Sequence, residues 1–301
     1  MIEIKEEFAH RIGTSEITIA FERMGNPENP PTILIMGAGA QMISWHNDFC
    51  KCLVDRGLFL VRFDSRDSGN STHFTNAPAP DFSAVMKGDF DTVSYTLSDM
   101  AADTIGLLDF LGLEKVHLVG ASMGGMIAQK IAIEHPGRVK SLTSIMSTTG
   151  NSSVGQADFS ILSKQGMPPF HDREEYIKWR VKSMNALSSP NYLFDEEWVR
   201  ESAALSWDRD HDPLGMTRQA VAVLKSGDRT KELMELKTPT LVIHGDSDKM
   251  CDVSGGIATA NAVPRSKLHI LKGMGHNLPK QLWNEIADLI AEHIHTFDKD
   301  N

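Results

Sequence analysis

Short apolar runs recur along the chain, and each one ends at a glycine or at polar residues. They lie at residues 32–36, 58–63, 116–119, 142–146, 240–243 and 267–271. Runs of this length and continuous hydrophobicity are typical of strands that are buried on both faces, as in a parallel sheet. Before them, residues 1–23 alternate polar and apolar side chains twice, which predicts an N-terminal hairpin.

Apolar residues at helical spacing separate most of these runs. The spacing predicts a helix over 98–111 with Ser98 as its N-cap, and further helices over 43–56, 123–134, 253–262 and 280–296. Strand and helix therefore alternate along the chain. We expect an α/β fold, with a mostly parallel central sheet covered by helices on both faces.

The alternation stops at residue 150. Between residues 151 and 236 we find no pattern of a buried strand, and prolines separate candidate helices at 172–187, 195–206 and 215–226. We therefore expect a core made of 1–150 and 237–301, interrupted by a helical cap, or lid, over 151–236. Large apolar residues of this cap either line a substrate pocket or form a small core of their own: Met167, Phe170, Trp179, Met184, Phe194, Trp198 and Trp207.

Composition narrows the possible partners. The 301-residue chain has a net charge of −10, which disfavours nucleic acid and anionic membranes as partners. No stretch approaches the roughly 20 apolar residues of a membrane span, and the acidic, alternating N-terminus does not resemble a signal peptide. Three cysteines cannot all pair, which favours a reducing compartment, and we expect a cytoplasmic protein. Cys50 and Cys52 lack a second pair of metal ligands, so we expect structural thiols, no metal and no cofactor.

Ser122 lies where a predicted buried strand runs into a predicted helix. The surrounding sequence is GASMGG, which matches the G-x-S-x-G pattern of a nucleophile elbow. The chain turns so sharply in such an elbow that side chains at positions 120 and 124 would collide with neighbouring backbone, so both must be glycine. The hydroxyl is then presented above a helix N-terminus, whose partial positive charge favours a developing oxyanion. We therefore interpret Ser122 as a nucleophile rather than as the serine of an ordinary turn.

A serine hydroxyl needs a base to act as a nucleophile. Among the twelve histidines, His276 lies in a glycine-rich loop, KGMGHNLP, directly after the last predicted strand. A loop at the carboxyl edge of the sheet can bring an imidazole over Ser122, whereas the other histidines have ordinary structural explanations. We expect His276 to be the base.

The base in turn needs an acid that orients it. The sequence GDSD follows the penultimate predicted strand and offers Asp246 and Asp248, with Asp252 further along the chain. We favour Asp248, and the alternative role of these aspartates is to cap the following helix. The loop at 146–156, which supplies the acid in some such folds, contains no acidic residue. The order serine, aspartate, histidine is the one expected for this architecture.

Backbone N–H groups are expected to hold the oxyanion. One belongs to Met123, directly after the nucleophile, and the other to the loop MGAGA at 36–40. Gly37 permits the turn of this loop, so we expect Ala38 to be the second donor. Candidate walls of the substrate pocket are Met42 and Trp45, which follow the loop, and Trp179, Phe194 and Trp207 of the cap.

Together these motifs resemble the α/β-hydrolase superfamily over nearly the whole chain. GASMGG is similar to its elbow, GDSD to its acid loop and GMGH to its histidine loop. The stretches FDSRDSGNS at 63–71 and GMGHNLP at 273–279 are similar to a serine esterase subgroup that includes the aclacinomycin methylesterase. The resemblance implies the same triad, oxyanion donors and cap. Lys249 departs from the pattern, since many relatives carry proline there.

Within FDSRDSGNS, residues Asp64, Arg66 and Asp67 are expected to form a structural turn rather than a catalytic loop, because loops at sheet edges need satisfied backbone groups.

The function that we expect is hydrolysis of small to medium carboxylic esters with an apolar group, through an acyl-enzyme. The serine argues against haloalkane dehalogenases and epoxide hydrolases, which resemble this family but use aspartate at that position. Lactonases, C–C bond hydrolases and cofactor-free perhydrolases stay open. A non-catalytic ligand-binding protein is a further alternative, although it would be expected to lose a triad member. The sequence does not define the oligomeric state.

Overall fold

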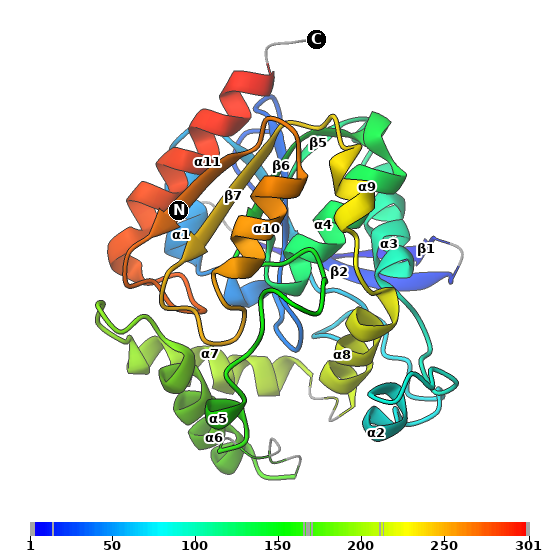
Figure 1. Ribbon diagram of the computed structural model, residues 1–301. Helices are drawn as coiled ribbons and strands as arrows, with labels where there is room; N and C mark the ends of the chain where they lie inside the picture. Colours follow the sequence, from blue (N-terminus) through cyan, green and yellow to red (C-terminus); the bar gives the residue numbers. More distant parts are fainter. Residues whose placement is uncertain are drawn as a thin grey trace.

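The central sheet of the structure has eight strands in the order β1-β2-β4-β3-β5-β6-β7-β8. The structure is a computed structural model, which describes residues 4–13, 15–164, 166, 169, 171–210, 212 and 214–298. The predicted hairpin is present as β1 (Glu6–Ile12) and β2 (Ile17–Met24), and β2 also pairs antiparallel with β4 (Phe59–Phe63). All other neighbours pair in parallel, namely β4 with β3 (Pro31–Ile35) and then β5 (Val116–Ala121), β6 (Val139–Ile145), β7 (Thr240–Gly245) and β8 (Lys267–Leu271). The predicted α/β class with a mostly parallel sheet is confirmed (Figure 1).

Helices cover both faces of the sheet (Figure 1). One face carries α1 (Asn47–Val54) and α11 (Trp283–Asp298), and the other carries α3 (Leu97–Phe110), α4 (Met123–Glu134) and α10 (Ser254–Ala262). Successive residues of a strand point to opposite faces. In β3, Leu34 accordingly packs in the α1–α11 layer, whereas Ile33 and Ile35 pack in the α3–α4 layer. A short helix, α2 (Phe82–Val85), and three 3-10 helices complete the core: Met42–Ser44, Pro136–Arg138 and Lys280–Leu282.

The N-cap predicted for α3 is wrong by two residues. Thr96 caps the helix, because its side chain accepts a hydrogen bond from the Asp99 N–H while the Asp99 side chain accepts one from the Thr96 N–H. This reciprocal capping box satisfies two backbone donors at once. Ser98 instead donates a hydrogen bond to Glu134 on α4.

Helices are also found within the segment 151–236. Its described part holds α5 (Phe159–Leu162), α6 (Arg173–Leu187), α7 (Glu196–Arg209), α8 (Gly215–Ser226) and α9 (Thr230–Met234). Helices α5 to α7 lie beyond the edge of the sheet toward which the β7 arrow points (Figure 1). Tyr176, Ile177 and Ala203 form a small buried cluster between α6 and α7. In contrast, Ala222 of α8 and Leu233 of α9 belong to the α3–α4 layer of the core.

Two further sequence expectations concern thiols and membrane spans. Cys50, Cys52 and Cys251 are all free; Cys50 and Cys251 are buried, and Cys52 is half-buried. Burial raises the pKa of the Cys50 thiol to about 11, which keeps it protonated and unreactive. Among the described residues, no helix has the length and apolar character that crossing a membrane requires. Met167 and Phe170, two of the predicted cap residues, lie outside the described residues.

Candidate active site

Ser122 lies in a strained turn between β5 and α4. Its φ of 55° and ψ of −122° are unfavourable for a residue with a side chain, and it is the N-cap of α4. A Cβ atom at Gly120 would lie 2.2 Å from the carbonyl oxygen of Gly124, and one at Gly124 would lie 2.1 Å from that of Ile35. The two glycines are therefore required on steric grounds, as the sequence motif predicts.

His276 lies between Ser122 and Asp248. Its Nε2 atom is 3.0 Å from Oγ of Ser122, and its Nδ1 atom is 2.8 Å from Oδ2 of Asp248. A carboxylate only accepts hydrogen bonds, so Nδ1 carries the proton of the neutral ring and Nε2 presents its lone pair to the serine hydroxyl. The structure thus places the predicted serine, histidine and aspartate in one chain of hydrogen bonds.

The carboxylate of Asp248 is buried and surrounded by donors. Its Oδ1 atom accepts hydrogen bonds from the N–H groups of Met250 and Cys251, each over 2.9 Å, and Nε2 of His244 lies 3.4 Å from Oδ2. Burial by itself would raise the pKa of Asp248. The positive charge that His276 carries when it is protonated, together with hydrogen bonds from His244, His276 and Cys251, outweighs burial and holds this pKa well below its usual range. Asp248 therefore stays ionised beside the imidazole.

The other two candidate acids have structural partners. Asp246 is exposed and accepts hydrogen bonds from the Gly273 N–H over 2.6 Å and from the Ser247 hydroxyl over 3.0 Å. Asp252 is exposed and accepts one from the Ser254 N–H at the first turn of α10. Both support loop and helix ends, which is the alternative role that the sequence left open for these aspartates.

The C-terminal end of α6 and the residues that follow it hold the histidine loop. The N–H of His276 donates to the carbonyl oxygen of Leu187 over 2.9 Å. The N–H of Gly275 donates to Oγ of Ser189, whose hydroxyl in turn donates to Oδ1 of Asn277. The inserted segment therefore fixes the backbone on both sides of the imidazole. Sequence reasoning did not identify Ser189, because a lone serine after a helix carries no distinctive pattern.

The loop that follows β3 lies directly against Ser122. A Cβ atom at Gly37 would be 3.4 Å from Oγ of Ser122, so the loop backbone lies next to this hydroxyl. Ala38 is exposed, and Met123 begins α4, where the first N–H groups of a helix have no partner within the helix. Both predicted oxyanion donors therefore belong to backbone that borders Ser122.

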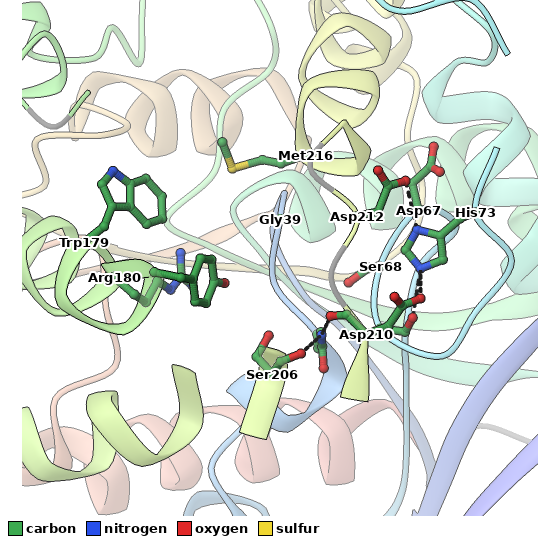
Figure 2. A pocket seen from close by; sticks show the side chains of 13 residues that line it. Gly39, Asp67, Ser68, His73, Trp179, Arg180, Ser206, Asp210, Asp212 and Met216 are labelled. Atoms are coloured by element: carbon green, nitrogen blue, oxygen red, sulfur yellow. Dashed lines mark hydrogen bonds and ion pairs between the residues drawn. The ribbon is translucent and has the colours of Figure 1, made fainter. Parts of the chain in front are cut away.

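A small cavity of about 60 Å³ lies beside this loop, between the core and the inserted segment (Figure 2). Its core wall includes Gly39, Ser68 and His73, and its opposite wall includes Trp179, Asp210 and Met216. Ser122, Asp248 and His276 are not part of the walls, so the cavity adjoins the loop rather than Ser122 itself. Polar and apolar surface contribute to its lining in nearly equal parts.

The structure separates the predicted pocket residues into three groups. Trp179 lines the cavity beside the loop. Trp207 packs at the margin of the small core of the inserted segment, with its ring centroid 5.2 Å from that of Tyr176, and Phe194 is half-buried just before α7. Met42 and Trp45 are fully buried, and Trp45 belongs to the α1–α11 layer of the core. The prediction that Met42 and Trp45 form a pocket wall is therefore wrong, because neither has surface for a substrate to touch.

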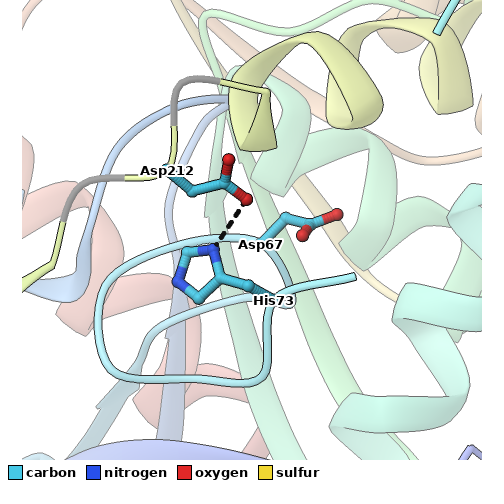
Figure 3. A group of neighbouring side chains, drawn as sticks. All are labelled: Asp67, His73 and Asp212. Carbon is cyan, nitrogen blue, oxygen red and sulfur yellow. Dashed lines mark hydrogen bonds and ion pairs between the residues drawn. The ribbon is translucent and has the colours of Figure 1, made fainter. Parts of the chain in front are cut away.

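The side chains of Asp67, His73 and Asp212 converge next to the cavity (Figure 3). Possible ligand atoms of the three lie within 4.8 Å of one another, as in a metal site. Arg218, however, pairs with both carboxylates, and Nδ1 of His73 lies 3.1 Å from Oδ2 of Asp212. Since the guanidinium already supplies positive charge at this point, we interpret the cluster as an ion-pair network.

The FDSRDSGNS loop after β4 receives two arginines of the inserted segment. Arg209 donates to Oδ2 of Asp64 over 2.9 Å, and Arg218 donates to both oxygens of Asp67 over 2.8 Å each. Both aspartate side chains are fully buried. Asp64 also accepts a hydrogen bond from the Met42 N–H over 2.7 Å. The loop is thus the structural turn that the sequence predicts, and it also docks the inserted segment.

Comparison with known proteins identifies the family. Residues 30–281 match the model of the alpha/beta hydrolase fold, and the chain belongs to this family. Over 94% of its length it is 26% identical to rhodomycin D methylesterase of Streptomyces peucetius, of which 96% is covered. It is also 30% identical to a 2-hydroxy-6-oxononadienedioate/2-hydroxy-6-oxononatrienedioate hydrolase of Pseudomonas putida, over 60% of this chain and 63% of that protein.

Solved structures of the same fold resemble the whole chain. That of 2-hydroxy-6-oxo-6-phenylhexa-2,4-dienoate hydrolase from a Rhodococcus species superposes with a TM-score of 0.76 at 20% identity, covering 98% of this chain and all of that one (100%). A thermophilic esterase from Thermogutta terrifontis superposes with a TM-score of 0.72 at 22% identity, covering 97% of this chain and 99% of that one.

Proposed function

We propose that this protein is a serine hydrolase that cleaves carboxylic esters through an acyl-enzyme. The observation that carries the proposal is the chain of hydrogen bonds from Ser122 through His276 to the buried, ionised Asp248. Similarity to a methylesterase over 94% of the chain supports ester hydrolysis in particular. The proposal assigns the triad to these three residues and the cap to the inserted segment.

In the proposed mechanism, Nε2 of His276 takes the proton of the Ser122 hydroxyl as Oγ attacks the ester carbonyl carbon. The N–H groups of Met123 and Ala38 stabilise the negative charge that develops on the carbonyl oxygen. Asp248 stabilises the imidazolium, which then protonates the departing alcohol. Water, deprotonated by His276, attacks the acyl-enzyme and releases the acid.

A fluorophosphonate probe followed by peptide mass spectrometry tests the nucleophile. We expect one adduct on Ser122, and no labelling of the Ser122→Ala variant. An unlabelled wild-type protein, or labelling that persists in Ser122→Ala, would contradict the proposal and would favour a ligand-binding protein on this scaffold. A panel of methyl and p-nitrophenyl esters with short, long, apolar and polar acyl groups then identifies the ester.

Hydrolysis of a C–C bond is the second candidate. It is favoured by the relative of Pseudomonas putida, whose name states a hydrolase of a 2-hydroxy-6-oxo dienedioate. Such an enzyme keeps the same triad, so probe labelling does not separate the two functions. The two functions are separated by comparing turnover of a 2-hydroxy-6-oxo-dienoate with turnover of methyl esters. Loss of the dienoate absorbance measures the first rate. Faster turnover of the dienoate than of every ester would replace the proposal. Two further assays test the remaining alternatives: hydrolysis of lactones, and formation of a peracid from acetate and hydrogen peroxide.

A further inference from the structure

Gln219 of α8 forms two hydrogen bonds that join separate loops of the core. Its side chain is fully buried, and its Oε1 atom accepts a hydrogen bond from the Gly39 N–H over 2.8 Å, across 180 positions of sequence. Its Nε2 atom donates to the carbonyl oxygen of Arg66 over 2.8 Å. One partner is a donor and the other an acceptor, so the amide fits in one orientation only.

The first turn of α8 holds Gln219 in place. A Cβ atom at Gly215 would lie 2.4 Å from the carbonyl oxygen of Asp67, so the helix begins in direct contact with the loop after β4. The neighbouring Arg218 is almost fully buried and donates two hydrogen bonds of 2.8 Å to the carboxylate of Asp67. A planar, bidentate pair of this kind fixes orientation as well as distance. Gln219 is therefore presented to Gly39 from a rigid support.

The loop at 36–40 is held on both sides of Ala38. Gly37 lies against Ser122, and Gly39 has a φ of +65° and packs so closely on Met216 of α8 that a Cβ atom there would lie 2.6 Å from its side chain. The carbonyl oxygen of Ala40 accepts a hydrogen bond from the Ser68 hydroxyl over 2.9 Å. Among the residues that the structure describes, Gln219 supplies the side-chain acceptor for the Gly39 N–H, which adjoins the peptide of Ala38.

We propose that Gln219 is a positioning residue that keeps the Ala38 N–H aimed at the oxyanion. This inference rests on the proposed function. It assigns the positioning of the second oxyanion donor to a side chain of α8, the helix that follows the cap helices α6 and α7. An oxyanion donor accelerates the reaction because it is oriented before the charge develops. Without Gln219, the Gly39 N–H turns toward water, and the loop populates orientations in which Ala38 does not face the reacting carbonyl.

The variant Gln219→Met tests the positioning role, since methionine keeps the length of the side chain and removes both hydrogen bonds. We expect kcat to fall about tenfold with KM nearly unchanged, a smaller loss than the roughly 10²–10³-fold cost of removing an oxyanion donor outright. The dissociation constant of phenylboronic acid, whose tetrahedral serine adduct places an oxygen in the oxyanion hole, should rise by a similar factor.

Gln129→Met is the matched control. Gln129 of α4 is also fully buried and accepts a hydrogen bond over 3.1 Å, but its partner is Arg229, the N-cap of α9, and not the loop at 36–40. We expect this variant to lower Tm while kcat and boronic acid binding stay at the wild-type values. If both variants change kcat to the same extent, Gln219 has only a structural role and the inference is wrong.

Gln219→Glu gives an independent readout by pH. A protonated glutamic acid can donate to the Arg66 carbonyl oxygen and accept from the Gly39 N–H, whereas the ionised form repels that carbonyl oxygen. We expect kcat of Gln219→Glu, relative to wild type, to fall as pH rises and the carboxyl ionises. If the ratio of the two kcat values does not change with pH, the inference is wrong. This test applies even if Gln219→Met fails to fold. If Ser122 is labelled by the probe while both Gln219 variants keep wild-type kcat, only this inference fails. If Ser122 is not labelled, the proposed function itself fails.

Discussion

Nε2 of His276 lies 3.0 Å from Oγ of Ser122, although 154 positions separate the two residues in the sequence. Ser122 directly follows β5 and His276 is in the loop after β8, and both strands end at the same edge of the parallel sheet. Side chains that follow parallel strands meet at that edge, where ligands bind in open α/β sheets. The distance is therefore a consequence of the sheet together with two short loops.

Replacing the acid separates Asp248 from Asp246. Asp248→Asn should lower kcat by about 10⁴-fold, because an asparagine amide can donate to Nδ1 and so favour the wrong imidazole tautomer. Asp246→Asn should lower it by less than about tenfold, since Asp246 binds loop backbone at Gly273. Steady-state rates of the two variants on one ester provide the measurement. The opposite ranking would assign the acid to Asp246.

The glycines of the elbow should not tolerate alanine. In Gly120→Ala the new Cβ atom would lie 2.2 Å from a backbone oxygen, and we expect a loss of about 3 kcal/mol or more in the free energy of unfolding. Gly137→Ala is the control, because no atom lies within 4 Å of a Cβ at that position. Its stability should stay within about 0.5 kcal/mol of wild type in urea unfolding. Equal stability of the two variants would show that the elbow is not sterically tight.

Removal of Arg209 should destabilise the fold much more than removal of Arg173. Arg209→Met leaves the buried carboxylate of Asp64 without this partner, which costs about 3–5 kcal/mol. Arg173 forms a shorter, bidentate pair with Asp208, but both of these side chains are exposed to solvent, so Arg173→Met should lower the free energy of unfolding far less. Denaturant unfolding of both variants compares the two pairs directly, and similar losses would contradict the buried role of Asp64.

The stability of the protein should fall steeply in mild acid. Burial lowers the pKa of His117 and of His293 to about 4 in the folded protein, below the ordinary value of 6.5. Protons therefore bind the unfolded chain first, and the stabilisation present above pH 6.5 is lost as the pH falls from about 6.5 to about 4. We expect Tm of His293→Phe to depend less on pH in this range than Tm of wild type, whereas replacing the exposed His10 should leave the dependence unchanged. Parallel curves for His293→Phe and wild type would refute this.

Short segments with local steric or hydrophobic signals could be predicted from the sequence. The parallel strands follow from continuous apolar runs, since a strand buried on both faces needs apolar side chains on both. Gly120 and Gly124 around Ser122 follow from the tightness of one turn. The placement of Asp248 and His276 directly after strands then follows from the geometry of a parallel sheet.

Contacts between distant segments were decided by tertiary packing. Met42 and Trp45 look like pocket residues in the sequence, but the structure buries both, and Trp45 packs in the core layer that α1 and α11 form. The pairs of Gln219 with Gly39 and of Arg209 with Asp64 join residues 180 and 145 positions apart. A buried polar side chain finds its partner only when two surfaces meet, so no local pattern of residues indicates which partner it will be. The sequence by itself therefore determined the strands, the elbow and the order of the catalytic candidates, whereas only the tertiary structure decided what supports them.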